Sequence, residues 1–420
     1  MLSFVGISIP IFVVKSGCMS QFYMPNIDFY AFDDKWSSSR MIFVAGPRQV
    51  GKTTFANNKI KKLGGSYFNW DNREVRLAYE KESSFFVKST KLNSLVVFDE
   101  IHKRRKWKDI LKGIYDTHKQ NYKFLITGSA RLDTFRRSGD SLVGRYFLTH
   151  FFPISAGDLL RLDFKEQVSP EVLLKDILNL NKVINKSDYD ALLKLNGFPE
   201  PFFKSSESFL RRWQSQHKEL LIREDLRDLS NVQSLDKIEV LVELLGNSVA
   251  NIISYNSLAQ DLEVDHKSVK QWLLQLEKIM LTFVIQPWSN KIQKSIRKNP
   301  KVYFYDWSTS SNEGYKFENF IACHLYKATT LWNDRYGHNF GLYFIRSYSG
   351  KEVDFCITLN KKPWLLVEAK NGYPEVSQAL KEYSKLLKVP GVIVTNEENW
   401  NVKNDDGYIF SARRFLSCLP

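Results

Sequence analysis

The chain has 420 residues, 60 of them Lys or Arg and 46 of them Asp or Glu, so its formal charge is +14. At about 150 residues per domain, this length predicts about two to four domains. Hydrophobic residues make up 43% of the chain and charged residues 25%, which excludes a disordered, collagenous or multi-span membrane protein. The four cysteines form no CxxC pair, which argues against a disulfide framework or a zinc site and fits a reducing compartment.

The amino-terminal stretch Leu2–Val14 is apolar, but Pro10 interrupts it and it is shorter than the roughly 20 residues that a membrane helix needs. It also lacks the basic residues that begin a secretory signal. We therefore expect no stable membrane span and a cytoplasmic location. Because a start at Met19 or Met24 would give a sensible shorter product, residues 1–24 are assigned to an apolar leader whose place in the native protein stays open.

The strongest motif begins in the apolar run Met41–Ala45, which leads into GPRQVGKTT and satisfies GxxxxGKT. The pattern predicts a strand, a glycine-rich turn and the start of a helix. In such a loop the backbone N–H groups surround phosphates, Lys52 reaches the β and γ oxygens of ATP, and the Thr53 hydroxyl binds Mg²⁺. The predicted nucleotide-binding residues are Gly46, Pro47, Arg48, Gln49, Val50, Gly51, Lys52, Thr53 and Thr54.

A second buried strand, Leu95–Phe98, ends in Asp99 and Glu100. Adjacent carboxylates at the end of a buried strand point to a functional site. We expect Asp99 to bind the magnesium ion and Glu100 to act as the general base that polarises the attacking water.

A third strand, Lys123–Thr127, ends in Gly128–Ser129. Ser129 is interpreted either as a sensor of the γ-phosphate or as an ordinary helix cap. Arg145, in SLVGRYF, is the chosen arginine finger, acting in its own chain or on a neighbouring one. Alternating strands and helices over residues 25–152 predict a parallel sheet with the nucleotide at its carboxyl edge.

Most of the positive charge lies in the first third of the chain. Residues 1–150 hold 25 basic and 13 acidic residues, and residues 101–150 alone hold 12 and 4. The run Lys103–Lys108 (KRRKWK) is either a solvated helix face or a contact for nucleic acid or an acidic partner. The spacing of the apolar residues that follow predicts an amphipathic helix; they are Trp107, Ile110, Leu111, Ile114 and Tyr115.

Residues 153–230 are leucine-rich and predict a small helical lid. Within its LLIREDLRDL segment, Arg223 either reaches back to the nucleotide or pairs with acids of its own helix.

Residues 231–300 predict a winged helix-turn-helix, with a two-stranded wing over Leu281–Lys301. Lys267, Lys270 and Gln271 should face outward on its second helix. DNA binding and packing against another protein domain both remain open for this unit.

The last unit, residues 301–420, contains two predicted strands, Lys351–Leu359 and Trp364–Lys370. If a turn of odd length joins the two strands, the numbers of any two residues that face each other add up to 722, and Asp354 lies opposite Glu368. A slip of one residue in the pairing would put the two acids on opposite faces. Two carboxylates beside the Lys370 ammonium could bind Mg²⁺ and steady a hydroxide at a phosphodiester, and a surface salt bridge is the alternative.

Taken together, the ordered motifs resemble those of the prokaryotic AAA+ ATPases that carry a C-terminal domain of unknown function related to PD-(D/E)XK nucleases. The resemblance covers about residues 38–375, and its motifs are GPRQVGKTT, FDEIHK, TGSARL with SLVGR, GFPEP, IREDL, KVYFYDWS, FENFI, EVDF and VEAK. It implies an α/β protein with a P-loop AAA+ parallel sheet, a helical lid, a winged helix and a nuclease-like domain. It also implies ATP binding by Lys52, Thr53 and Asp99, and a nuclease triad of Asp354, Glu368 and Lys370 with Glu318 as the helix acid.

The predicted function is Mg²⁺-dependent binding and hydrolysis of ATP, coupled to movement of the lid and winged helix against the C-terminal domain. The alternatives are an ATP-gated, metal-dependent DNA nuclease and a nucleotide-switched binding protein without turnover. DNA would bind the basic face of residues 103–145 and the winged helix, and the other expected partners are a protein or further copies of the chain.

Overall fold

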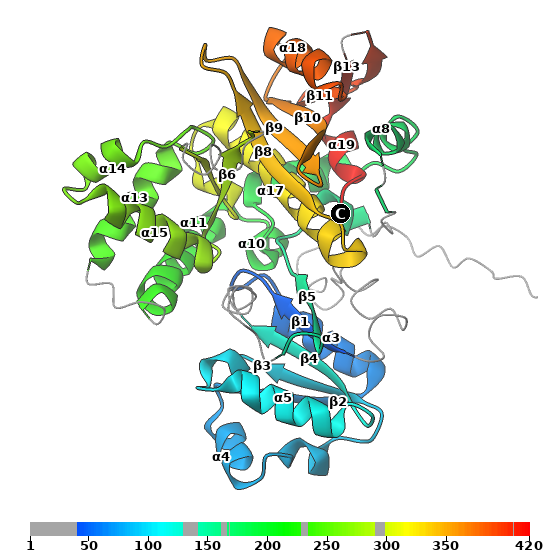
Figure 1. Cartoon of the computed structure of the whole chain (residues 1–420), viewed down its shortest axis with the longest axis vertical. Helices are drawn as coiled ribbons and strands as arrows, with labels where there is room; N and C mark the ends of the chain where they lie inside the picture. The colour runs from blue at the N-terminus through cyan, green and yellow to red at the C-terminus, as the bar shows by residue number, and fades with distance from the viewer. Residues whose placement is uncertain are drawn as a thin grey trace, which may run out of the picture.

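The computed structural model describes residues 40–128, 142–160, 166–167, 169–227, 234–289, 299–405 and 407–420. The leader over residues 1–24, the expected sensor Ser129 and residues 290–298 of the expected wing lie outside these ranges. The predicted α/β class is confirmed, because two sheets with helices packed on them make up most of the described chain (Figure 1).

The first sheet has five parallel strands in the order β2-β3-β4-β1-β5. Helices cover both of its faces, so the central strands are buried throughout, as their continuous apolar sequences predict. Alternate residues of β1 point to opposite cores: Val44 packs with Phe55 of α3, and Phe43 packs with Trp107 of α5. The strands are β1 Met41–Ala45, β2 Gly65–Asn69, β3 Leu95–Asp99, β4 Lys123–Gly128 and β5 Tyr146–His150. The helices of this region are α3 Lys52–Leu63, α4 Arg73–Lys81, α5 Trp107–His118 and the 3₁₀ turns η2 Phe85–Ser89 and η3 Ile101–Lys103.

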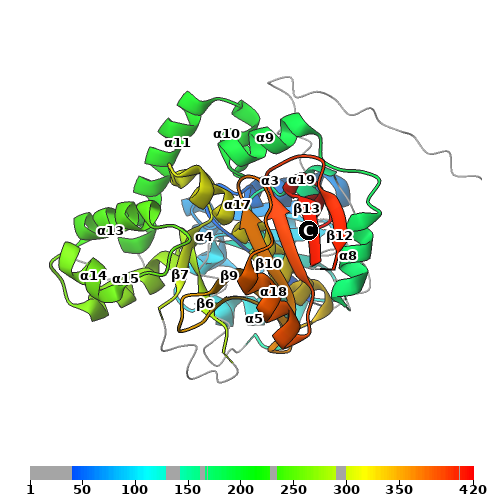
Figure 2. The same cartoon turned by 90° about the horizontal axis from the view of Figure 1, so that it is seen from above.

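A mostly helical region follows. Figures 1 and 2 show α13, α14 and α15 to one side of the two sheets and α8 on the opposite side. Side-chain caps begin several of its helices: Ser206 accepts a hydrogen bond from Phe209 N at the start of α11, and Asp265 accepts one from Lys267 N at the start of α15. The π-helix η5 continues α11 without a break. The elements are α7 Ala156–Leu160, α8 Pro170–Leu178, α9 Lys186–Leu195, α10 Pro199–Lys204, α11 Glu207–Glu219, η5 Leu220–Leu226, α13 Leu235–Asn247, α14 Tyr255–Asp261 and α15 His266–Lys278.

The segment expected to form a winged helix has the predicted helices, but its strands are not a separate wing. Strands β6 (Thr282–Pro287) and β7 (Lys301–Phe304) pair in antiparallel fashion, and β6 also pairs in parallel with β8 of the C-terminal sheet. Their apolar residues on both faces, such as Phe283 and Val302, are buried and therefore need this cover. The expected domain boundary between residues 300 and 301 thus falls inside one strand pair.

The second sheet has eight strands in the order β12-β13-β11-β10-β9-β8-β6-β7. Helices α17 and α19 pack on one face, and α18 packs on the other. The remaining strands are β8 Phe340–Arg346, β9 Glu352–Leu359, β10 Lys362–Lys370, β11 Gly391–Thr395, β12 Asn401–Asn404 and β13 Gly407–Ser411. The helices are η6 Trp307–Thr309, α17 Glu313–Tyr336, α18 Gln378–Leu387 and α19 Ala412–Ser417.

The hairpin of β9 and β10 has the register that places Asp354 opposite Glu368, but a turn of odd length does not set it. Its turn has two residues, Asn360 and Lys361, both with positive φ. A bulge between Pro363 and Leu365 then shifts the pairing, and Val367 comes to lie opposite Phe355, as the sum of 722 requires. Pro363 has no N–H to give to the ladder, which is the physical reason for an irregularity there.

Buried polar contacts connect α17 to the segment that follows β5. The Lys327 ammonium donates to the Asp158 carboxylate and, at 2.8 Å, to the Ser155 hydroxyl, and both charged groups are at most 5% exposed. Farther along α17, Asp334 accepts hydrogen bonds from the backbone N–H of His150 at 2.8 Å and pairs with its ring. The C-terminal sheet and the first sheet are therefore joined through one helix. Within the described ranges, no helix combines the length and apolar character needed to cross a bilayer.

This junction predicts a stability effect. Lys327→Met should lower the free energy of unfolding by about 3–5 kcal/mol, because it leaves the Asp158 carboxylate buried without its cation. Lys327→Met/Asp158→Asn should regain much of this loss, since the amide is neutral and still accepts from Ser155 N. Urea denaturation checks both variants, with Lys186→Met, which removes an exposed pair worth about 0–1 kcal/mol, as the control. Equal unfolding midpoints for Lys327→Met and Lys186→Met would contradict the prediction.

Candidate active site

The glycine-rich loop connects β1 to α3 at the carboxyl edge of the first sheet. A Cβ atom on Gly46 would lie 2.2 Å from the Phe151 carbonyl oxygen, so only glycine fits beside the neighbouring strand. Gly51 has a φ of 103°, which also favours glycine, and α3 begins at the next residue. Both glycines of the motif are thus required by the backbone, and the loop leaves the N-terminus of α3 facing the site.

Lys52 is held back against this loop. Its ammonium donates to the carbonyl oxygens of Gly46 at 2.9 Å and Pro47 at 2.6 Å, and the side chain is buried. Burial lowers the pKa of Lys52 to about 8, although the carboxylates of Glu100 and Asp99 pull it upward. The ammonium is therefore largely charged at neutral pH and lies where a phosphate chain bound by the loop would meet it.

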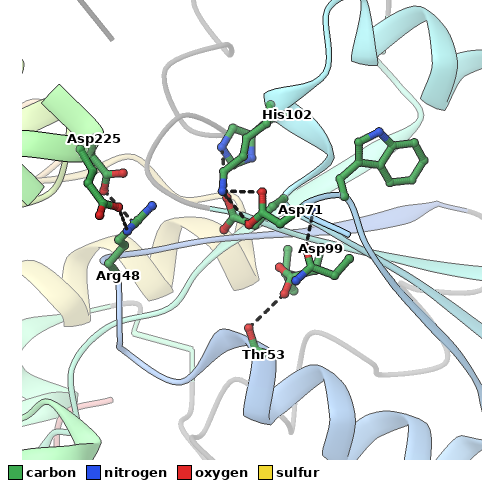
Figure 3. A network of polar contacts seen from close by, with 12 residues as sticks. Arg48, Thr53, Asp71, Asp99, His102 and Asp225 are labelled. Atoms are coloured by element: carbon green, nitrogen blue, oxygen red, sulfur yellow. Dashed lines mark hydrogen bonds and ion pairs between the residues drawn. The ribbon is translucent and has the colours of Figure 1, made fainter. Parts of the chain in front are cut away.

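Asp99 lies beside the start of α3, because the carboxyl ends of parallel β1 and β3 meet at one edge (Figure 3). Its Oδ2 accepts a hydrogen bond from Thr53 Oγ1 at 3.0 Å and another from the Tyr67 hydroxyl, while its Oδ1 accepts one from Thr127 Oγ1 at 2.6 Å. The predicted pair of Thr53 and Asp99 is therefore brought together. A hydroxyl next to a carboxylate is a set of oxygen donors that fits Mg²⁺.

Tyr67 was missed by the sequence analysis. It lies on β2, which neighbours β3 in the sheet, so its side chain reaches Asp99 although no motif marks it. Burial and the hydrogen bond to Asp99 raise the pKa of Tyr67, so the phenol stays protonated and donates. A polar tyrosine near the end of a strand next to an acidic strand end is the signal that could have indicated this contact.

Glu100 follows Asp99 with a left-handed backbone, φ 59°, a conformation that is uncommon for residues other than glycine. Its N–H donates to the Thr127 carbonyl oxygen at 2.9 Å, and its carboxylate lies 3.5 Å from both Lys103 Nζ and His102 Nε2. Burial raises the pKa of Glu100, while Lys103 and Lys52 oppose the shift. A partly buried carboxylate with a raised pKa is suited to the predicted role of general base.

Two residues of the phosphate loop, Arg48 and Gln49, contact the helical region. Arg48 Nε lies 3.0 Å from Asp225 Oδ2, and its Nη1 lies 3.4 Å from Glu224 Oε2 (Figure 3). Gln49 Oε1 lies 2.9 Å from His217 Nδ1. Burial lowers the pKa of His217 to about 4, so the neutral ring donates to the amide oxygen. The phosphate loop is thus attached to α11 and η5 by an ion pair and a hydrogen bond.

Arg223 takes neither of the roles expected for it. Its guanidinium pairs with Glu239 at 2.9 Å and lies 3.6 Å from Asp236, both on the following helix α13. The two acids that follow it in sequence face Arg48 instead. Of the charged residues in the IREDL motif, Glu224 and Asp225 are therefore the ones that contact the phosphate loop.

Arg145 also lies away from the loop of its own chain. It precedes β5, its carbonyl oxygen accepts from Met41 N at 2.9 Å, and its guanidinium pairs with Asp116 of α5 at 2.8 Å. Met41 begins the five residues of β1, so at roughly 3.3 Å per residue about 16 Å of strand separate Arg145 from the loop. The role of arginine finger within the same chain is therefore wrong, and action on a neighbouring chain stays a prediction.

The basic run next to Glu100 is partly paired. Lys103 lies 2.7 Å from an oxygen of Asp71, and Arg104 lies 3.1 Å from one of Glu80. The helix that follows buries Trp107, Leu111, Ile114 and Tyr115, which confirms its predicted amphipathic character.

The four candidate nuclease residues gather at one end of β9 and β10. Asp354 Oδ2 accepts from Ala369 N at 2.9 Å, and Glu368 pairs with Lys370 at 2.7 Å. Glu318 of α17 contacts Lys301, a residue the sequence analysis did not assign to this site. Burial, followed by the neighbouring Glu318 carboxylate, raises the pKa of Asp354. In the part of the chain that the structure describes, no group of three His, Cys, Asp or Glu side chains is arranged as metal ligands.

Three protein families match successive parts of the chain. Residues 38–160 match the AAA domain family, residues 186–311 match a domain of unknown function (DUF8612), and residues 313–415 match another (DUF4143). Two uncharacterized proteins of Methanocaldococcus jannaschii are similar over most of their length. One is 26% identical, with 88% of this chain and 83% of the relative covered, and the other is 24% identical, with 87% and 82% covered.

The sequence identity to the following proteins of solved structure is lower than the identity to these two relatives. The ORC1 protein of Aeropyrum pernix in complex with DNA is 14% identical, covers 67% of this chain and 88% of its own, and has a TM-score of 0.32. RuvB of Thermotoga maritima is also 14% identical, covers 62% and 84%, and has a TM-score of 0.29. The assignment rests on the AAA match, on the five-stranded parallel sheet and on the loop with its two acids. Residues 38–160 are therefore an AAA domain of the P-loop NTPase class, and the chain continues into two domains of unknown function.

Proposed function

We propose that this chain binds Mg·ATP at the Gly46–Thr53 loop, hydrolyses it with Glu100 as the general base, and couples the nucleotide state to the helical region through Arg48. The observation that carries the proposal is the contact of Thr53 with Asp99, next to the partly buried Glu100 carboxylate. These groups come from separate segments and have the chemistry that phosphoryl transfer to water requires.

Each side chain has a defined task in this proposal. Loop N–H groups and the Lys52 ammonium bind the phosphates, and Lys52 exchanges its two carbonyl partners for phosphate oxygens. Thr53 and Asp99 would hold Mg²⁺, which when bound neutralises charge on the phosphates. Tyr67 and Thr127 orient the Asp99 carboxylate. Glu100 accepts a proton from the attacking water.

Glu100→Gln tests the hydrolytic step. The amide cannot accept the proton from water, so kcat should fall by about 10²-fold or more while ATP binding persists. Phosphate release and binding of a fluorescent ATP analogue measure the two quantities. Glu80→Gln is the matched control, because Glu80 also pairs with a residue of the basic run but lies on α4. Phosphate release at the wild-type rate from Glu100→Gln would refute the proposed base.

The coupling follows from the position of Arg48. Its guanidinium belongs to the loop that receives the triphosphate, and it holds two carboxylates of η5 beside that loop. Arriving phosphates compete with Asp225 for the guanidinium and repel the carboxylates. Binding of ATP is therefore expected to loosen the attachment of η5, and a firm attachment should weaken ATP binding by the same factor.

Asp225→Asn tests this coupling. Removal of the competing charge should tighten ATP binding about fivefold or more, the lower limit of common coupling energies. It should also make proteolysis of the helical region less dependent on nucleotide. Arg223→Gln is the control, because that side chain pairs with α13 instead of the loop. An unchanged ATP affinity in Asp225→Asn, equal to that of Arg223→Gln, would rule out the coupling.

A second candidate function is nucleotide-switched DNA binding. Lys267, Lys270 and Gln271 are exposed on α15, as expected for a helix that reads a groove. In this proposal, the movement that ATP causes in η5 is passed to α13 and α15 and changes their access to DNA. Binding that weakens steeply with salt and depends on Lys267 and Lys270 would support it.

A further inference from the structure

The ammonium of Lys301 lies in the middle of the acidic cluster of the nuclease-like domain. Its Nζ is 2.6 Å from Glu352 Oε1, 3.0 Å from Glu318 Oε1 and 3.9 Å from Asp354 Oδ1. Lys301 is 2% exposed, so water does not replace these contacts. Three carboxylates from α17 and β9 therefore share one buried cation that β7 supplies.

The acids of the cluster also have other donors. Glu318 Oε1 accepts from the Tyr303 hydroxyl at 2.8 Å, and Arg346 Nη1 lies 2.8 Å from Glu352 Oε2. Asp354 Oδ2 accepts from Ala369 N, and Glu368 pairs with Lys370 and accepts from the Ser377 hydroxyl at 2.7 Å. The carboxylates are thus directed at protein donors. No group of three in the described chain has the arrangement of metal ligands.

The backbone on both sides keeps Lys301 in this place. Its strand pairs with β6, where Lys301 lies opposite Ile285. On the other side, Ile253 N donates to the Pro300 carbonyl oxygen at 3.0 Å, and Ala250 N donates to that of Val302 at 3.2 Å. The lysine therefore arrives from a strand fixed by the segment between α13 and α14.

A divalent cation would require the same space. The resemblance places the cation on Asp354 and Glu368. Magnesium and calcium bind carboxylate oxygens at about 2.0–2.6 Å, so a cation on Asp354 would meet the Lys301 ammonium, which lies 3.9 Å from Asp354 Oδ1, at close range. Glu368 is already paired with Lys370. Two cations in one buried cluster repel each other strongly. The residues present therefore do not fit the metal that the nuclease resemblance implies.

We propose that Lys301 is a built-in replacement for the metal ion, so that Glu318, Glu352 and Asp354 form a structural ion cluster that joins β7 to the C-terminal domain. This cluster is part of the connection between the helical unit α13–α15 and the C-terminal sheet. In this proposal the C-terminal domain needs no metal ion and anchors the helical unit α13–α15 through β7. The proposal does not depend on ATP hydrolysis.

Binding of Mn²⁺ to the nucleotide-free full chain, followed by electron paramagnetic resonance, tests the proposal. Wild type and Glu318→Gln should take up the same amount of Mn²⁺, because Glu318 holds Lys301 and no metal. Lys301→Met leaves three carboxylates without a cation, so it should gain one Mn²⁺ site and a Tm that rises with Mn²⁺. Lys301→Met/Glu318→Gln should lose that gain. Thr53→Ala, at the phosphate loop, identifies any uptake that belongs to the ATP site.

Two results would overturn the proposal. One is Mn²⁺ uptake by the wild type that Asp354→Asn or Glu318→Gln abolishes and Thr53→Ala leaves intact. The other is a folded Lys301→Met variant that gains no Mn²⁺ site. If Lys301→Met fails to fold even with Mn²⁺, the comparison of wild type with Glu318→Gln still decides whether a metal occupies the cluster.

Discussion

The hydrogen bond from Thr53 to Asp99 is the contact on which the arrangement of the AAA domain depends. It joins the first turn of α3 to the end of β3, two segments separated by 46 positions in the chain. A carboxylate this deeply buried is tolerated because three hydroxyl groups donate to it. The parallel sheet makes the contact possible, since it brings the carboxyl ends of β1, β3 and β4 to one edge. Glu100 and Lys52 are placed by the same constraint.

Charged contacts join the separate parts of the chain to one another. Arg48 connects the phosphate loop to η5, Lys327 connects α17 to the segment after β5, and Lys301 connects β7 to the C-terminal acids. The contacts differ in burial, and this separates their roles. The two lysines are almost completely buried, where breaking a pair is costly, so they suit permanent junctions. Arg48 is a quarter exposed and lies at the nucleotide loop, so its pair is the one suited to opening and closing.

Some residues of the candidate site can be assigned from sequence motifs, and others cannot. Gly46, Gly51, Lys52, Thr53, Asp99 and Glu100 could be assigned because their spacing relative to strands determines where they lie in any parallel sheet of this kind. Tyr67, Glu224, Asp225 and Lys301 could not be assigned in that way. Each of these residues contacts its partner across a strand pairing or a domain contact. The partners are far apart in the sequence, so the local pattern of polar and apolar residues does not show which of them will meet. The distance of Arg145 from the loop of its own chain could not be foreseen for the related reason that sequence does not say which edge of the sheet a turn occupies.

The sequence by itself determined the α/β class, the phosphate loop and its acids, and the amphipathic face of α5. These features follow from apolar periodicity, glycine requirements and strand ends, which are local properties of the chain. Only the tertiary structure decided that the β6–β7 strands belong to the C-terminal sheet, that the acids of η5 face Arg48, and that a lysine fills the acidic cluster. The physical reason is that a buried charge pairs with whichever opposite charge lies next to it in the folded protein. Many sequences with the same local pattern would place a different residue next to that charge.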